Sequence, residues 1–211
     1  METAKISKKL LNRIPRYLNY LKSLPDDCES ISATVIARDL NLGEVQVRKD
    51  LAKVCEAGRR RTGRSRTQLI QDIENYLNVT ANTGAILVGT GKLGQALLDY
   101  SGFEEYGMNL LAGFDISPFA DQTGRGTPIY PMNQLEHFCK HYNVRIGVIA
   151  VPLESAQAVC DSLVSCGIKA IWNFAPVPLK VPTGVVVHNE NLAASLSVLR
   201  IRMRRKLAEE E

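Results

Sequence analysis

Two different patterns of hydrophobic and polar positions divide this chain. Over the first 75 residues, apolar side chains recur at spacings of three and four, beginning with the run from Leu10 to Leu21, which Pro25 closes. From about residue 85 onward, short apolar runs alternate with helical patterns. The first part is therefore predicted to be a small helical domain, and the second an α/β domain.

A helix-turn-helix is predicted within the first part. Ser32 is placed to cap a short helix over 34–40, and a third helix is predicted over 44–54. Only the turn 41–43 separates these two helices. Helix, three-residue turn and helix is the arrangement that many DNA-binding proteins use.

The third helix is predicted to have a reading face and a packing face. In a helix-turn-helix this helix enters the major groove, so its outward side chains should be polar and cationic. The residues predicted to pack on the helices beneath are Val45, Val47 and Leu51. The residues predicted to contact DNA are Gln46, Arg48 and Lys49.

A basic segment after this helix is predicted to form the wing of a winged helix. Residues 58–66 hold five arginines between turn residues, and such a hairpin can place guanidinium groups along phosphates or in a narrow minor groove. An exposed, disordered basic loop is the alternative. A further helix is predicted over 67–77. The candidate DNA contacts in the segment are Arg59, Arg60, Arg61 and Arg64.

Strands and helices alternate in the second part of the chain. Runs typical of strands cover residues 85–88, 109–114, 145–151, 168–172 and 185–187. Helical patterns cover residues 92–100, 132–142 and 153–166. Parallel strands joined by right-handed crossovers produce this alternation, so the predicted fold is a doubly wound parallel sheet of the Rossmann type.

A glycine-rich turn between the first of these strands and its helix is the best candidate for a binding site. Its sequence is Gly89-Thr90-Gly91-Lys92-Leu93-Gly94. Gly89 permits a sharp turn, Gly91 lets the backbone approach a pyrophosphate, and Gly94 lets the helix pack close to the sheet. Free N–H groups at the start of the helix favour a diphosphate, so the turn predicts dinucleotide binding.

Asp115 indicates which dinucleotide the site prefers. It ends the next strand, 21 residues after Gly94, where a carboxylate accepts hydrogen bonds from the adenosine ribose and repels a 2′-phosphate. NAD(H) is therefore the expected cofactor. Ile116 and the pair Val151-Pro152, at the carboxyl edge of the sheet, are expected beside it. An empty, degenerate Rossmann site is the alternative.

Catalysis is not expected of this chain. About 95 residues follow Asp115, too few for a substrate domain, and no histidine has a convincing catalytic partner in the sequence. The α/β domain is therefore interpreted as a receptor for the nucleotide. A small NAD-dependent oxidoreductase with a basic extension is the alternative.

A last helix, from about residue 191 to 207, carries a single apolar stripe surrounded by arginines. The stripe could pack on a partner subunit or on the protein's own core, and the pattern leaves both open. Its members are Leu192, Leu196, Leu199, Met203 and Leu207.

The charge distribution sets the two parts further apart. Residues 1–75 hold 15 Lys and Arg against 10 Asp and Glu, a net +5, whereas the remainder holds 11 against 12, a net −1. A local basic excess is typical of nucleic-acid-binding modules, although a solvated basic face also produces it. The five cysteines are widely spaced with no C-x-x-C pair, so no metal site is expected. With no membrane-spanning run and no signal peptide, a soluble, cytoplasmic protein is expected.

These motifs together resemble the Rex family of redox-sensing transcriptional repressors, over nearly the whole chain. The most specific segments are 46–51, 88–94, 113–115, 173–176 and 179–182. The resemblance implies a homodimer that exchanges its C-terminal helix between subunits and binds palindromic operator DNA until NADH releases it. It also implies that Tyr100 lies near the nicotinamide, that the three glycines hold the pyrophosphate, and that Asp115 holds the adenosine ribose. The resemblance further implies that Arg48 and Lys49 contact DNA, and that Arg60 does so from the wing.

Two departures from the family pattern concern the link between the subunits. Asn191-Leu192 stands where the family usually has an aspartate and a phenylalanine, and Asn19 stands where relatives carry the arginine that pairs with that aspartate. The charge pair between subunits would then be lost. A diverged paralogue that binds DNA without responding to NADH is therefore a further hypothesis.

The predicted organisation has four segments. They are a winged-helix DNA-binding domain over 1–78, a linker over 79–84, a Rossmann NAD(H)-binding domain over 85–190 and a C-terminal dimerisation helix over 191–211.

Overall fold

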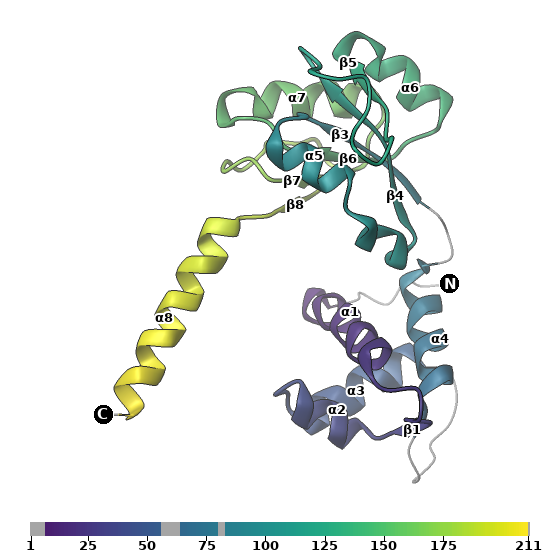
Figure 1. Ribbon diagram of the computed structural model, residues 1–211, viewed down its shortest axis with the longest axis vertical. Helices are drawn as coiled ribbons and strands as arrows, with labels where there is room; N and C mark the ends of the chain where they lie inside the picture. The colour runs from purple at the N-terminus through teal and green to yellow at the C-terminus, as the bar shows by residue number, and fades with distance from the viewer. Residues whose placement is uncertain (1–6, 56–63, 80–82, 211) are drawn as a thin grey trace. The chain divides into compact units, whose positions relative to one another are not determined.

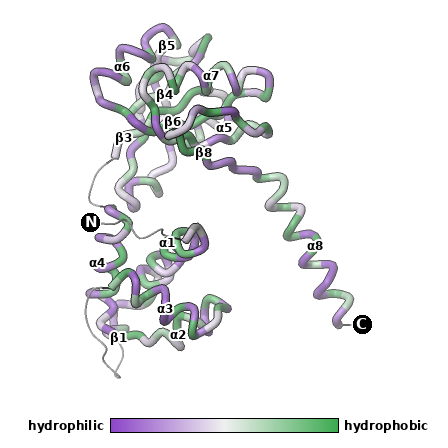
Figure 2. The backbone as a smooth tube through the Cα atoms, turned by 180° about the vertical axis from the view of Figure 1, so that it is seen from behind, coloured by the Kyte–Doolittle hydropathy of each residue, from purple (hydrophilic) through white to green (hydrophobic). Residues whose placement is uncertain are grey.

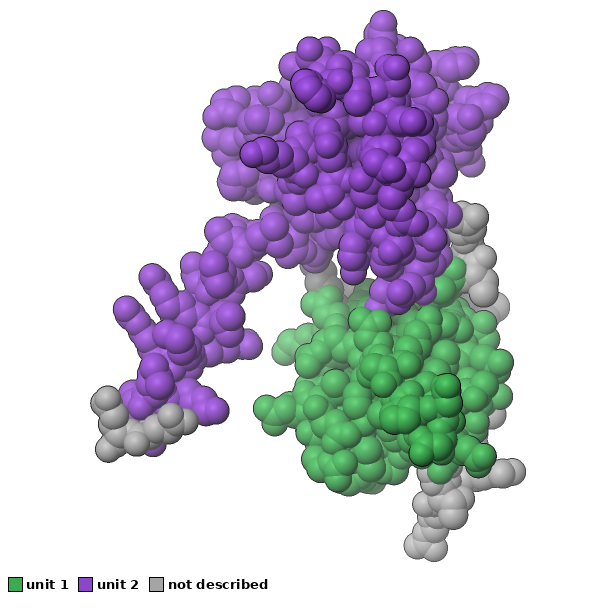
Figure 3. Space-filling model, viewed as in Figure 1, with its two compact units in different colours: residues 1–81 green, residues 82–211 purple. Residues whose placement is uncertain are grey.

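A computed structural model of the chain describes residues 7–55, 64–79 and 83–210 (Figure 1). The chain divides into two compact units, residues 1–81 and residues 82–211 (Figure 3). The helical pattern ends and the strand pattern begins at this division, and each unit buries its own apolar side chains.

The N-terminal unit packs four helices with a short antiparallel strand pair, within the residues described. Its elements are α1 Lys8–Ser23, β1 Ser30–Ile31, α2 Ala33–Asp39, α3 Glu44–Val54, β2 Arg64–Ser65 and α4 Arg66–Leu77. Strand β1 pairs with β2, with Ser30 opposite Ser65. This order of helices and strands is that of a winged helix. Arg59, Arg60 and Arg61, predicted at the wing tip, lie outside the described residues.

Local sequence signals set the boundaries of the helix-turn-helix. The Ser32 hydroxyl accepts a hydrogen bond from the Val35 N–H at 3.2 Å, which is the predicted cap of α2. After α2 the chain turns through Asn41, whose φ of 52° lies in the left-handed region that asparagine tolerates. Helix α3 then covers residues 44–54, as predicted.

The packing face of α3 differs from the prediction at Val45. Val47, Leu51 and Val54 are buried, but Val45 is 63% exposed. A helix turns about 100° per residue, so a side chain two positions before Val47 lies on the far side of the helix. The prediction that Val45 packs on the helices beneath is wrong. The position between Val47 and Leu51 that does face the core is Asp50, which is 3% exposed.

A buried ion pair fixes α3 against α1. The Asp50 carboxylate accepts hydrogen bonds from Arg13 Nε at 2.6 Å and Arg13 Nη2 at 3.0 Å. It also accepts from the Tyr17 hydroxyl at 2.9 Å and from Gln46 Nε2 at 2.8 Å. Burial alone would raise the pKa of Asp50, but these hydrogen bonds and the Arg13 charge outweigh it and lower the pKa. The carboxylate is therefore ionised in the folded protein.

The second unit holds a six-stranded parallel sheet with the order β5-β4-β3-β6-β7-β8. This confirms the predicted doubly wound fold. Its strands are β3 Thr83–Val88, β4 Met108–Asp115, β5 Ile129–Pro131, β6 Ile146–Ile149, β7 Ala170–Asn173 and β8 Val186–Asn189. Its connecting helices are α5 Lys92–Leu98, η2 Ser101–Tyr106, η3 Met132–Gln134, α6 Leu135–His141 and α7 Leu153–Ser165.

Helices cover both faces of this sheet, and successive residues of β3 point to opposite faces. Ile86 and Val88 belong to the core that α6 and α7 cover. Leu87 belongs to the core on the other face, with Leu98 of α5. The edge strand β5 was not predicted. It has three residues and ends in a proline, which is tolerated at a sheet edge but gives no strand pattern.

Helix α8, Leu192–Glu210, leaves its apolar stripe uncovered. The five stripe residues are between 53% and 69% exposed, so the stripe does not pack on the core of the second unit. Hydrophobic and hydrophilic residues alternate along the helix (Figure 2). The Asn191 side-chain oxygen caps its start, accepting from the Ala194 N–H at 2.8 Å. In the part of the chain described, no helix combines the length and hydrophobicity that crossing a bilayer requires.

Replacing Asp50 with asparagine should destabilise the N-terminal unit. The change removes the buried charge that Arg13 faces, and we expect the free energy of unfolding at pH 7 to fall by roughly 2 kcal/mol. The folded-state pKa of Asp50 lies below its ordinary value of 3.8, so its charge stabilises the fold above that value. This contribution disappears as the pH falls through the lower, folded-state pKa.

Thermal unfolding followed by circular dichroism at several pH values measures the effect. The difference between wild type and Asp50→Asn should be constant near pH 7 and shrink below about pH 3.8. Fluorescence of Trp172, the one tryptophan, reports on the second unit and should not change. An undiminished difference at low pH would contradict the assigned role of the ion pair.

Candidate nucleotide cleft and DNA-binding face

A cleft of about 480 Å³ opens at the carboxyl ends of the central strands, where ligands of open α/β sheets bind. It lies between the glycine turn at the start of α5 and the start of α7. Most of the predicted cofactor residues line it: Gly89, Gly91, Lys92, Leu93, Asp115, Ile116, Val151 and Pro152. Thr90 and Gly94 are buried and do not line it.

Each glycine of the turn meets a different requirement. Gly89 has φ +98°, and a Cβ there would lie 2.6 Å from the Ala150 carbonyl oxygen. A Cβ on Gly94 would lie 1.9 Å from the Gly89 carbonyl oxygen, so only glycine lets α5 approach the strand this closely. Gly91, in contrast, has no atom within 4 Å of its Cβ position. It faces the open cleft, where backbone N–H groups at the helix start attract an anion.

Asp115, at the end of β4, is held beside the glycine turn by hydrogen bonds. Its Oδ2 atom accepts hydrogen bonds from the Thr90 N–H at 2.7 Å and the Thr90 hydroxyl at 3.1 Å. Its Oδ1 atom accepts from the Ser117 N–H at 3.0 Å. Burial raises the pKa of Asp115, but the hydrogen bonds from Ser117 and Thr90 outweigh burial, and the pKa is lowered. A fixed negative charge therefore borders the cleft, suited to ribose hydroxyls and unsuited to a further phosphate.

Further residues that the sequence does not predict also line the cleft, and most of them are apolar. Met132 begins η3, and Ser155 and Val159 lie one turn apart on α7. Their spacing of four on the helix after β6 is the signal that could have identified Ser155 and Val159. Met132 lies at the cleft because it directly follows the edge strand β5, and no sequence pattern predicts that strand. Apolar walls beside the glycine turn and the Asp115 carboxylate suit a ligand that combines flat rings with polar or charged groups.

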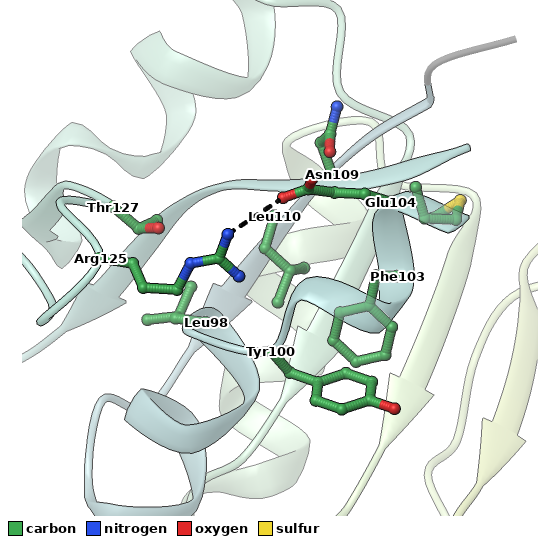
Figure 4. A pocket seen from close by; sticks show the side chains of 9 residues that line it. Leu98, Tyr100, Phe103, Glu104, Asn109, Leu110, Arg125 and Thr127 are labelled. Atoms are coloured by element: carbon green, nitrogen blue, oxygen red, sulfur yellow. Dashed lines mark ion pairs between the residues drawn. The ribbon is translucent and has the colours of Figure 1, made fainter. Parts of the chain in front are cut away.

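Tyr100, predicted near the nicotinamide, does not line this cleft. It follows the C-terminal end of α5, whereas the glycine turn lies at the N-terminal end, roughly 10 Å away for a helix of this length. Tyr100 instead borders a separate small pocket with Phe103, Glu104 and Arg125, in which Arg125 pairs with Glu104 at 3.8 Å (Figure 4). The rings of Tyr100 and Phe103 meet edge to face, 5.0 Å apart.

The outward face of α3 presents the predicted reading residues. Gln46, Arg48 and Lys49 are all exposed. Arg48 forms an ion pair one turn back with Glu44, and Gln46 hydrogen bonds one turn forward to Asp50. The outward face of α3 therefore carries the cations Arg48 and Lys49, and the amide of Gln46 on this face is hydrogen bonded to Asp50.

Two arginines of the basic segment turn back onto the N-terminal unit. Arg64, a predicted DNA contact, is half-buried, and its guanidinium lies 3.5 Å from the Leu51 carbonyl oxygen. Arg66 starts α4 and donates hydrogen bonds to the carbonyl oxygens of Leu21 at 2.8 Å and Pro25 at 2.9 Å. Arg66 is thus a structural residue that ties α4 to the end of α1.

The cysteines and histidines form no candidate catalytic or metal centre. Cys55, Cys139 and Cys160 are buried, and burial raises the pKa of Cys55 and of Cys139 to about 11. His137 and His141 are exposed on one face of α6, with their rings stacked 6.1 Å apart. Among the residues described, no three His, Cys, Asp or Glu side chains are arranged to hold a metal ion.

Two family models match the chain, one for each unit. Residues 5–52 match the model described as "Putative DNA-binding protein N-terminus", and residues 80–177 match the model described as "CoA binding domain".

Similar proteins match over nearly the whole chain. The "Redox-sensing transcriptional repressor Rex" of Porphyromonas gingivalis strain ATCC 33277 is 39% identical over 202 residues, covering 95% of this chain and 93% of the relative. The protein of the same name from Bacteroides fragilis is 38% identical over 204 residues, covering 96% of this chain and 93% of the relative.

Solved structures of a protein named RSP, described as a Rex-family repressor, share the fold at 31% sequence identity. The structure without a named ligand has a TM-score of 0.86 and covers 99% of this chain and 98% of RSP. RSP in complex with beta-NADH has a TM-score of 0.88, covering 99% of both chains. RSP in complex with beta-NAD+ and operator DNA has a TM-score of 0.87, covering 99% of this chain and 97% of RSP.

Substituting alanine at Gly94 and at Gly91 should separate the structural glycine from the one that faces the cleft. The Gly94 Cβ would collide with a backbone oxygen, so we expect Gly94→Ala to lower the free energy of unfolding of the second unit by roughly 3 kcal/mol. Gly91 has an ordinary φ of −65° and open space, so Gly91→Ala should change it by less than about 1 kcal/mol.

Urea denaturation followed by Trp172 fluorescence measures both variants. Equal stability losses in Gly91→Ala and Gly94→Ala would show that the close approach at Gly94 does not determine the packing of α5.

Proposed function

The chain belongs to the Rex family of redox-sensing transcriptional repressors, and from this membership we propose that it is a DNA-binding repressor that responds to the NADH/NAD+ balance. One observation carries the proposal: the same chain holds a glycine-turn cleft with an acidic border and a helix-turn-helix with a cationic outer face. Its relatives are repressors, and this chain is likewise assigned a regulatory role and not an enzymatic one.

The N-terminal unit supplies the proposed DNA contacts. Arg48 and Lys49 on α3 are exposed and cationic, and α3 is the helix that enters the major groove in this fold. We assign both to DNA, together with Gln46. Arg59, Arg60, Arg61 and Arg64 are assigned to the wing, and the half-buried Arg64 is placed at its base. The complex of RSP with operator DNA supports this assignment for the family.

The cleft is the proposed site for NAD(H). The glycine turn would hold the pyrophosphate on backbone N–H groups, and Asp115 would accept hydrogen bonds from the adenosine ribose. Ile116, Val151 and Pro152 would contact the rings. The solved complexes of RSP with beta-NADH and beta-NAD+ support the choice of cofactor.

The uncovered stripe of α8 supports a homodimer. Five apolar side chains along one helix are more than half exposed in a single chain, and a second subunit is the partner that the family implies. We propose that α8 is exchanged between subunits. A role for Tyr100 near the nicotinamide also requires the partner, because Tyr100 does not line the cleft of its own chain.

Release from DNA follows from a difference in affinity between two arrangements of the dimer. If NADH binds more tightly to the arrangement whose recognition helices are wrongly spaced for two half-sites, it shifts the population away from DNA. RSP with operator DNA holds beta-NAD+, which is in keeping with this direction. We also propose a cytoplasmic location, which a repressor that acts on DNA supports.

A second candidate is a DNA-binding paralogue without the NADH response. The observation that favours it is Asn191, whose side chain caps α8 where the family usually has an aspartate. An asparagine supplies the cap but no charge, so it cannot form an ion pair between subunits.

Replacing Arg48 with alanine should weaken DNA binding. We expect at least a tenfold rise in Kd for a palindromic duplex and a shallower dependence on salt, because a cationic contact is lost. Fluorescence anisotropy at several salt concentrations measures both. Lys140→Ala is the matched control, since Lys140 forms the same kind of ion pair one turn away, with Glu136, on the exposed face of α6. If both variants bind like wild type, α3 is not the reading helix.

NADH should dissociate the complex with DNA, and NAD+ should do so far less. Titration of each nucleotide into the preformed complex, followed by anisotropy, measures the shift. Gly91→Ala should need more NADH, because its methyl group occupies the position where the backbone meets the pyrophosphate. If neither nucleotide changes DNA affinity while saturating the cleft, the paralogue without a response is the correct assignment.

A further inference from the structure

Among the exposed residues of α3, Gln46 has a side chain that the fold has already oriented. Its Nε2 atom lies 2.8 Å from Asp50 Oδ1, one helical turn away. Two other glutamines make the same pair, Gln68 with Asp72 in α4 and Gln157 with Asp161 in α7. In those pairs the aspartate is not buried and has no arginine behind it among the contacts described.

The buried ion pair decides which end of the Gln46 amide faces inward. Two donors of Arg13 and the Tyr17 hydroxyl hold the Asp50 carboxylate ionised, and an ionised carboxylate only accepts hydrogen bonds. The amide end that faces Asp50 is therefore the NH2 group. The Oε1 atom and the second N–H of Gln46 remain for another partner.

The remaining pair of atoms has a defined recognition pattern. An amide NH2 has two hydrogens, one that points away from the amide oxygen and one on the same side as it. When the first is directed at Asp50, the second lies beside Oε1, and one acceptor and one donor are then side by side. Adenine presents the complementary N6 donor and N7 acceptor in the major groove, whereas guanine presents two acceptors there.

We propose that Gln46 reads an adenine in each half-site, and that Asp50, held by Arg13, is the positioning residue that selects adenine over guanine by preventing the amide from flipping. The inference rests on the proposed DNA binding by α3 and adds to it the identity of one base. The ion pair from α1 thus contributes to sequence specificity without any contact to DNA.

Selection of duplexes from a random library by the full-length protein tests the proposal first. Wild type should recover a half-site with an adenine whose preference disappears in Gln46→Ala, while the preferences at the other positions remain. Gln46→Glu should change that preference to cytosine, because a carboxylate only accepts and cytosine N4 donates. Gln68→Ala, which removes the matched pair on α4, should recover the wild-type half-site.

Base analogues in the selected duplex then test the contact itself. Replacing the adenine by purine, which lacks the amino group, or by 7-deazaadenine should weaken wild-type binding roughly tenfold. Gln46→Ala should bind all three duplexes equally. Asp50→Asn should retain binding but lose most of its preference for adenine over guanine. If Asp50→Asn does not fold, the Gln46 variants still decide whether Gln46 reads the adenine.

The possible failures are distinct. A wild-type selection that recovers no sequence overturns the proposed function, and this inference with it. A selected half-site with no adenine preference that depends on Gln46, or equal effects of the analogues on wild type and Gln46→Ala, overturns this inference alone and leaves Gln46 as a structural partner of Asp50.

Discussion

The nucleotide cleft depends on how closely the first turn of α5 approaches the end of β3. The ideal Cβ position on Gly94 lies 1.9 Å from the Gly89 carbonyl oxygen, so no side chain is possible there. This contact aims the start of α5 at the carboxyl edge of the sheet and leaves Gly91 open. It also brings Thr90 to Asp115, 25 residues away, where two hydrogen bonds hold the carboxylate at the cleft. The absence of a side chain at Gly89 and Gly94 therefore fixes both the glycine turn and the carboxylate that border the cleft.

The N-terminal unit solves a comparable problem by burying a charge. Asp50 faces the core because the helical repeat puts it between Val47 and Leu51, and it is tolerated because Arg13 and Tyr17 satisfy it. A buried ion pair contributes less to stability than a well-packed apolar residue can, but its geometry is directional. Here that direction fixes α3 against α1 and reaches the outer face of α3 through Gln46.

Local and repeating signals explain what the sequence could predict. The helix-turn-helix, the Ser32 cap and the glycine turn each depend on residues within one or two turns of each other. The ion pair from Arg13 to Asp50 spans 37 residues and has no local signal, so a buried aspartate was not expected. The prediction for Val45 is wrong because it places residues 45 and 47 on one face, and alternate residues share a face in a strand but not in a helix. Only the family resemblance predicts Tyr100 near the nicotinamide, and within one chain Tyr100 does not line the cleft.

Helix α8 exposes an apolar surface that the rest of its own unit does not cover. Its stripe is more than half exposed, and Val198 and Ile201 add apolar surface outside the stripe. Most helices in proteins derive their stability from packing, so this helix requires a covering surface that the second unit does not provide. An exchanged helix would supply it and would attach the cleft of one subunit to the body of the other. A nucleotide that alters the contacts around such an exchanged helix would change the orientation of one subunit relative to the other. That orientation sets the distance between the two recognition helices, which has to match the spacing of the half-sites. Asn191 lies at the start of this helix as a neutral cap, so any coupling through α8 in this protein has to depend on packing and not on a charge pair at that position.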